Sequence, residues 1–120
     1  MAMKIEKINS DNRGDIYGYK IGNRQHIIVT FNEEGIARGG HYHKTNQWHI
    51  CLAGKLNVKI RDVVNEIETE RIMIESNSIL IPAGFAHLFI AEEPSVLAES
   101  RIGDYEATDY EPYRKLARPK

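Results

Sequence analysis

The sequence predicts an all-β protein, an antiparallel sandwich or barrel, and two observations favour this class. Short runs rich in β-branched or alternating apolar residues follow one another at close spacing, with turn residues between them. No long helical period interrupts these runs before residue 104. Many short strands of this kind are typical of antiparallel sandwiches and barrels. We expect one further element, a short helix over 109–116, with Pro112 tolerated in its first turn.

The strands can be assigned in chain order. Residues 15–21 and 26–31 are rich in β-branched and aromatic side chains and are bounded by turn residues. Residues 55–61 alternate polar and apolar side chains, as in a strand that is exposed to water on one face. We expect a hairpin turn at Ala53–Gly54 to join this strand to the preceding one at 47–52. The remaining expected strands are 67–74, 78–81, 87–91 and 96–102.

Length, charge and cysteine content limit the class of protein. The 120 residues contain no repeat, so we expect one domain over 1–120. The formal charge of −1 gives no electrostatic reason to bind nucleic acid or an anionic membrane. No apolar run approaches the ~20 residues that a membrane span needs, and the start lacks the apolar core of a signal peptide. Because Cys51 is the only cysteine, no intrachain disulfide can form, and we expect a cytoplasmic protein.

Three histidines indicate a functional site. His41 and His43 are one residue apart, and His87 follows in the second half of the chain. Residues i and i+2 of a strand point to the same face, so an extended segment aims both His41 and His43 into one space. Imidazole suits proton transfer near neutral pH and is also the commonest metal ligand in proteins. The spacing therefore predicts a site for proton transfer or for metal binding.

The same parity argument applies to the strand at 47–52. If Gln47 continues the inward face, Gln47, His49 and Cys51 share that face. The other face then carries an apolar outward stripe of Trp48, Ile50 and Leu52. A turn at 44–46 could break this register, so we interpret His49, like His26, as an ordinary polar strand residue.

Two segments resemble the motifs of the cupin superfamily. The first motif, Gly-x5-His-x-His-x3,4-Glu-x6-Gly, matches at Gly35, His41, His43 and Gly54, with Gln47 in place of the glutamate. The second, Gly-x5-Pro-x-Gly-x2-His-x3-Asn, matches at Pro82, Gly84 and His87, with Ser76 and Ala91 in place of its first and last residues. The resemblance implies a small antiparallel β-barrel or jelly roll with the three histidines at its mouth. It also implies a homodimer, for which the outward apolar stripe provides a surface.

A longer resemblance concerns the sugar 3,4-ketoisomerases, cupins that act on dTDP-linked 4-keto-6-deoxy sugars without needing a metal. It rests on residues 11–14, 38–44, 50–54 and 105–110. It implies that His41 and His43 shuttle protons and that Arg38 helps to hold the substrate, with Arg13, Gln47 and His87 as further substrate-binding residues. The family carries tyrosines on the preceding strand, where this chain has Ile27, Ile28 and Val29.

The chemistry of this isomerisation fits two imidazoles on one strand face. A base removes the C3 proton and an acid–base group returns a proton at C4, while O4 gains a proton and O3 loses one in step, so that the ketone moves from C4 to C3 through an enediol. The small-molecule substrate would be similar to a dTDP-sugar, its diphosphate would pair with the arginine, and no cofactor is required.

Two alternatives remain open. The first is a metal-dependent cupin, either a small dioxygenase or a sugar-acid isomerase. It would bind one divalent ion of Fe, Zn, Ni or Mn through His41, His43, Gln47 and His87. The second alternative is a non-catalytic cupin that binds a sugar.

Overall fold

The computed structural model describes residues 5–103 and 105–117. The chain forms a sequence of strands followed by one short helix, α1 (Glu111–Arg114). The strands are β1 (Glu6–Asp11), β2 (Gly14–Ile21), β3 (Arg24–Phe31), β4 (Ala37–Tyr42), β5 (Gln47–Ala53), β6 (Lys55–Asp62), β7 (Ile67–Ile74), β8 (Ser78–Ile81), β9 (Phe85–Ala91), β10 (Ser95–Ile102) and β11 (Thr108–Asp109).

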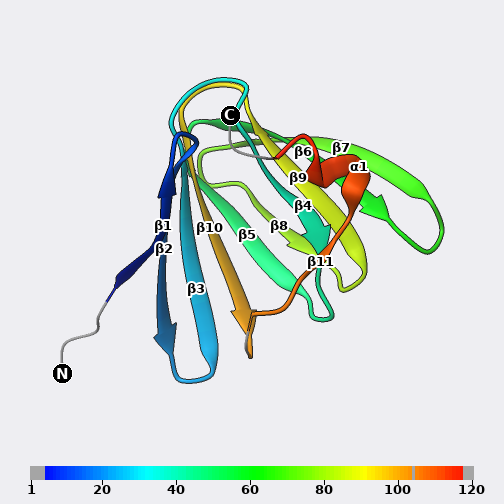
Figure 1. Cartoon of the computed structure of the whole chain (residues 1–120), viewed down its shortest axis with the longest axis horizontal. Coiled ribbons are helices and arrows are strands. Elements are labelled where there is room, and N and C mark those ends of the chain that lie inside the picture. The colour runs from blue at the N-terminus through cyan, green and yellow to red at the C-terminus, as the bar shows by residue number, and fades with distance from the viewer. Residues whose placement is uncertain (1–4, 104, 118–120) are drawn as a thin grey trace.

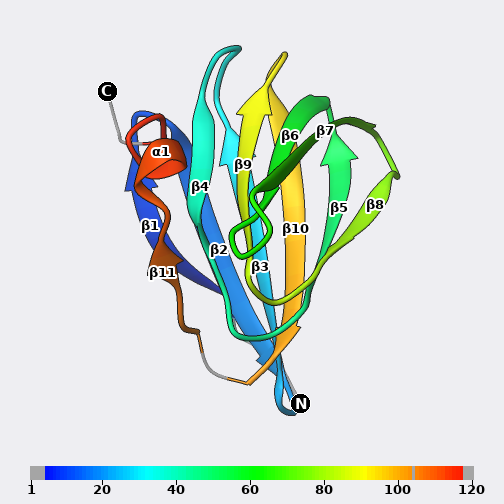
Figure 2. The same cartoon turned by 90° about the vertical axis from the view of Figure 1, so that its right-hand side faces the viewer.

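The strands form two antiparallel sheets that face each other (Figures 1 and 2). One sheet has the order β1-β2-β3-β10-β5-β8, and the other has the order β11-β4-β9-β6-β7. The main core lies between them and includes Phe31, Leu56, Ile81, Phe89 and Leu97, each at most 2% exposed. The predicted all-β class is therefore confirmed, and the expected strands recur within a few residues of their predicted ends.

The structure corrects two expectations about individual elements. Strands β5 and β6 do not form a hairpin, since β5 pairs with β8 and β10 whereas β6 pairs with β7 and β9. Gly54, with a φ of 86°, instead carries the chain from one sheet to the other. The helix is also shorter than the predicted 109–116, because Asp109 pairs with β4 as part of β11. Alternation locates a strand but does not reveal its partners.

The parity predicted for β5 is confirmed. Trp48, Ile50 and Leu52 are 50%, 41% and 44% exposed, whereas Gln47 and His49 are buried. The homodimer expected from this apolar stripe stays a prediction.

None of the helices in the described residues is long and apolar enough to cross a membrane.

Gly54 offers a test of this connection between the sheets. A Cβ at Gly54 would lie 2.4 Å from the Pro94 carbonyl oxygen and 2.8 Å from Ser95 Cα. Gly35 has a similar φ of 88°, but no described atom lies within 4 Å of a Cβ there. Gly35→Ala should therefore cost only the left-handed backbone strain, roughly 1–2 kcal/mol. Gly54→Ala should cost about 1–3 kcal/mol more, because backbone must also move.

Urea unfolding of both variants measures this difference. Equal losses of unfolding free energy in Gly54→Ala and Gly35→Ala would contradict the close approach of β10 to the turn at Gly54.

Candidate functional site

A β-bulge in β4 sets the geometry of the site. Arg38 and His41 are three residues apart, so strict alternation would place them on opposite faces of the sheet. The register of β4 against β9 shifts between Gly39 and His41, and Gly39 and Gly40 have φ angles of 109° and 83°. The extra residue of a bulge restores the parity. Arg38 and His41 consequently line the same cavity.

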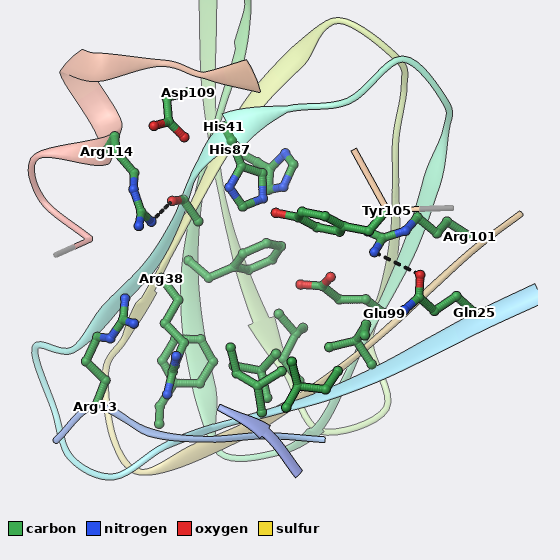
Figure 3. A pocket seen from close by; sticks show the side chains of 18 residues that line it. Arg13, Gln25, Arg38, His41, His87, Glu99, Arg101, Tyr105, Asp109 and Arg114 are labelled. Atoms are coloured by element: carbon green, nitrogen blue, oxygen red, sulfur yellow. Dashed lines mark hydrogen bonds between the residues drawn. The ribbon is translucent and has the colours of Figure 1, made fainter. Parts of the chain in front are cut away.

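This cavity has a volume of about 470 Å³ and lies between the two sheets, with the segment after β10 along one side. Figure 3 shows His41 and His87 at one side of it, with Glu99 pointing toward them across the space. Arg13 and Arg38 enter from another side. Basic, acidic and imidazole groups therefore converge on a space that is large enough for a small organic molecule.

The three predicted histidines form one cluster. Ring centroids of His41 lie 4.7 Å from His43 and 5.1 Å from His87, and those of His43 and His87 are 5.3 Å apart. One ring nitrogen from each histidine lies within 4.8 Å of the other two. The register explains the cluster, since His41 lies opposite His87 across the β4–β9 pair.

Hydrogen bonds to the main chain define the tautomers of two of these rings. Nδ1 of His43 lies 2.5 Å from the Glu106 carbonyl oxygen, and Nδ1 of His87 lies 3.2 Å from that of Phe85. A carbonyl can only accept, so each Nδ1 carries the proton and donates it. Nε2 is then left with a lone pair. Nε2 of His43 is buried and has no hydrogen-bond partner in the described part of the chain.

Burial holds all three rings in the neutral form. Loss of solvent, followed by the charge of His43, lowers the pKa of His41 to about 4. Burial likewise lowers the pKa of His43, and it lowers that of His87 well below its usual value. Near neutral pH the cluster therefore presents unprotonated nitrogens, which can accept a proton or bind a metal ion.

The structure separates the two histidines predicted to shuttle protons. His41 and His87 line the cavity, whereas His43 is 4% exposed, contacts both of these rings and does not line the cavity. Gln47 is 1% exposed, and neither atom of its amide has a hydrogen-bond partner among the described residues. It too lies outside the cavity wall.

The two predicted arginines differ in how far they are already bound. Arg13 lines the cavity, but its guanidinium donates to the Asp11 carboxylate and to the Ala117 carbonyl oxygen. Arg38 is 6% exposed and donates from Nε to the Thr30 carbonyl oxygen. Its Nη2 is buried without a partner in the residues that the structure describes. Of these two arginines, Arg38 is therefore the one with hydrogen-bonding capacity left for a ligand.

Sequence reasoning missed an acidic residue in the cavity, Glu99 on β10. Nε2 of His49 lies 3.6 Å from Glu99 Oε1, and His49 is fully buried. His49, interpreted as an ordinary polar strand residue, therefore lies on the buried inward face of β5 beside Glu99. Burial would raise the pKa of Glu99, but its contact with the His49 imidazole has the opposite effect, and the pKa falls to about 2. Glu99 lies two residues after Leu97 and therefore shares its strand face. A polar side chain on a face that otherwise points inward could have indicated a site.

The segment after β10 closes one side of the site. Tyr105 lies over the Arg101 guanidinium, 4.3 Å from ring centroid to Cζ, and both line the cavity. Glu106 binds His43 through its carbonyl and accepts a hydrogen bond from the Lys44 amide at its carboxylate. Arg114 donates to the Gly39 carbonyl oxygen. The C-terminal segment thus fixes the strand that carries the histidines.

Comparisons with models of protein families and with curated proteins find no match. Solved structures do match. Staphylococcus aureus CapF, a capsular polysaccharide assembling protein, superposes with a TM-score of 0.73 at 19% identity, over 88% of this chain and 30% of its own. A mutant of Bacillus subtilis oxalate decarboxylase gives 0.73 at 21% identity, over 87% and 29%. Vicilin from hazelnut, Corylus avellana, gives 0.73 at 15%, over 88% and 34%.

This chain therefore spans about a third of the length of each of these proteins. Sequence identities this low show a similarity of fold alone. Together with the two facing antiparallel sheets, the matches show that the chain has an all-β, cupin-like fold.

Proposed function

We propose that the protein isomerises a nucleotide-linked 4-keto-6-deoxy sugar by histidine acid–base catalysis through an enediol. The observation that carries this proposal is that His41 and Arg38 line the same cavity. His41 is a neutral imidazole, and the buried Nη2 of Arg38 has no partner among the described residues. One group can accept a proton from carbon, and the other can hold an anion beside it.

The anion-binding role of Arg38 follows from the cost of burying unpaired donors. A buried N–H without an acceptor loses its hydration and gains nothing in return, and a buried cation costs more still. A phosphate or carboxylate oxygen would supply both the acceptor and the opposite charge. Arg101 and Arg114 also line the cavity and add positive potential for an anionic substrate.

Proton transfer would begin at His41. The pKa of about 4 makes this imidazole a weak base in the free protein. An anion held by Arg38 favours the charged imidazolium and so raises the pKa of His41 toward neutrality. His41 would take the C3 proton, the C–H electron pair would form the C3=C4 double bond, and O4 would take up a proton to give the enediol. Loss of the O3 proton with protonation at C4 would then leave the ketone at C3 and a hydroxyl at C4. His43, whose ring lies against that of His41, can exchange the proton with it.

The structural matches support a carbohydrate substrate only by analogy. CapF is a capsular polysaccharide assembling protein, so its role concerns sugars. The ketoisomerase resemblance of residues 38–44 points to the same class of substrate.

The proposal predicts that His41→Asn and His43→Asn each lower turnover by ~10² to 10⁴, since asparagine keeps some hydrogen bonding but cannot transfer the proton. NMR in deuterated water, with a panel of dTDP-4-keto-6-deoxyhexoses, measures ring-proton exchange and ketone migration. His26→Asn is the matched control, because His26 stacks on Tyr19 and does not line the cavity.

Wild-type protein that catalyses neither exchange nor migration with any sugar of the panel would eliminate the isomerase. Exchange that survives both substitutions would keep the reaction and reject His41 and His43 as its catalysts.

A metal-dependent reaction is the second candidate, and the convergence of His41, His43 and His87 favours it. Metal-binding histidines usually donate their other ring N–H to a carbonyl or carboxylate, as His43 and His87 do here. The residues therefore fit a divalent ion, which the three imidazoles would hold, with the buried amide of Gln47 as a further oxygen ligand. Such an ion would supply Lewis acidity to a bound oxygen group.

We predict substoichiometric metal after purification without added metal, because Gln47 brings no negative charge to the site. Gln47→Glu should tighten Zn²⁺ or Mn²⁺ binding, as measured by elemental analysis and by competition with a chelator. A full equivalent of tightly held metal in the wild type, required for turnover, would instead favour the metal-dependent candidate. Unchanged affinity in Gln47→Glu would place Gln47 outside the site.

A further inference from the structure

The two sides of the cavity differ in chemical character. The histidines, Glu99 and the arginines all come from β4, β9, β10 and the C-terminal segment, apart from Arg13. The wall formed by β1, β2 and β3, which lie beside β10 in one sheet, is mainly apolar. It carries Ile8, Ile16, Ile27 and Val29, with Gln25 beside Arg101 and Phe31 beside Arg38. We call Ile8, Ile16, Ile27 and Val29 the apolar wall.

The strand register makes the apolar wall continuous. Ile16 lies opposite Val29 in the β2–β3 pair, and Gly18 lies opposite Ile27. Gly18 leaves room for Ile8, since a Cβ at Gly18 would lie 2.4 Å from Ile8 Cδ1 and 3.3 Å from Ile27 Cδ1. The register of β1 shifts between Lys7 and Asn9, the position of Ile8. Ile8 therefore extends the wall to the solvent-exposed rim, where it is 55% exposed.

An apolar wall selects against a ligand that is polar on all sides. Hydroxyl groups facing Ile16, Ile27 and Val29 would lose their hydration without gaining partners, which costs free energy. An alkyl group in the same place would leave water and gain about 0.8 kcal/mol for each buried CH₂, or about fourfold in affinity. The wall and the unpaired Arg38 Nη2 border one cavity, so a single ligand can satisfy both.

We infer that the natural ligand is an organic phosphate with an apolar substituent. Its phosphate pairs with Arg38, and its apolar group of several carbon atoms lies on the apolar wall. The inference rests on the anion-binding role of Arg38 in the proposed function, but it does not depend on isomerase chemistry. For a sugar substrate, it assigns to the wall the deoxy carbon or a larger apolar substituent.

Alkyl phosphates test this inference without knowledge of the substrate. ³¹P NMR titration gives the Kd of methyl, butyl and hexyl phosphate for the full chain. Hexyl phosphate should bind at least about tenfold more tightly than methyl phosphate, since two or more buried CH₂ groups suffice for that ratio. Equal affinities across the series would overturn the inference.

Two substitutions locate the alkyl chain. Ile8→Thr and Val29→Thr should each lower the ratio of hexyl phosphate affinity to methyl phosphate affinity at least threefold. Ile8 is exposed, so Ile8→Thr keeps the test valid if Val29→Thr fails to fold. Ile72→Thr is the matched control, because Ile72 on β7 is 52% exposed and lies outside the cavity wall. An equal fall of the ratio in Ile72→Thr would contradict this placement of the alkyl chain. An unchanged ratio in both wall variants would also contradict it.

Arg38→Gln locates the phosphate. It should weaken methyl phosphate binding at least about tenfold and preserve the hexyl-to-methyl ratio. Unchanged methyl phosphate affinity would refute the placement of the anion at Arg38. Expected alkyl selectivity in a protein that exchanges no sugar proton would reject the isomerase and keep this inference. Isomerase activity without alkyl selectivity would reject this inference and keep the isomerase.

Discussion

The bulge at Gly39–Gly40 is the constraint on which the site depends. Both residues have positive φ angles, which glycine adopts without strain. Both are also crowded, since a Cβ at Gly39 would lie 2.8 Å from the His87 carbonyl oxygen, and one at Gly40 would lie 2.5 Å from Arg114 Cα. The bulge turns Arg38 and His41 into one cavity and lets the C-terminal segment close against the strand. In a regular β4, Arg38 and His41 would point to opposite faces of the sheet and could not line one cavity.

Hydrogen bonds to main-chain carbonyls determine the tautomers of two histidines in the site. By accepting the Nδ1 protons of His43 and His87, they leave Nε2 of each ring with a lone pair. Burial then keeps the imidazoles neutral. The same lone pairs serve a proton or a metal ion, so the sequence motif alone could not decide between the two kinds of chemistry. The choice between proton transfer and metal binding depends on the charges around the rings. Gln47 brings no negative charge, and the acidic Glu99 lines the cavity from another strand.

Local patterns predicted what depends on local geometry. The strand runs, the inward face of β5 and the association of His41, His43 and His87 all follow from a period of two residues and from motif spacing. The hairpin at Ala53–Gly54 was predicted wrongly because partner choice depends on distant strands. Glu99 escaped prediction for a related reason, since its contact with His49 arises only from the pairing of β10 with β5. The closure by Glu106 also depends on a long-range contact that no local pattern encodes.

The central claim is that His43 and His87 are neutral rings protonated at Nδ1, with a lone pair on Nε2. Long-range ¹H–¹⁵N NMR correlation of the imidazole nitrogens in metal-free protein measures this most directly. At pH 6, below the ordinary histidine pKa of about 6.5, an exposed imidazole is mostly charged. We predict that both rings remain neutral at this pH, with a protonated Nδ1 and an unprotonated Nε2. Charged imidazolium, or the opposite tautomer at both rings, would contradict the account.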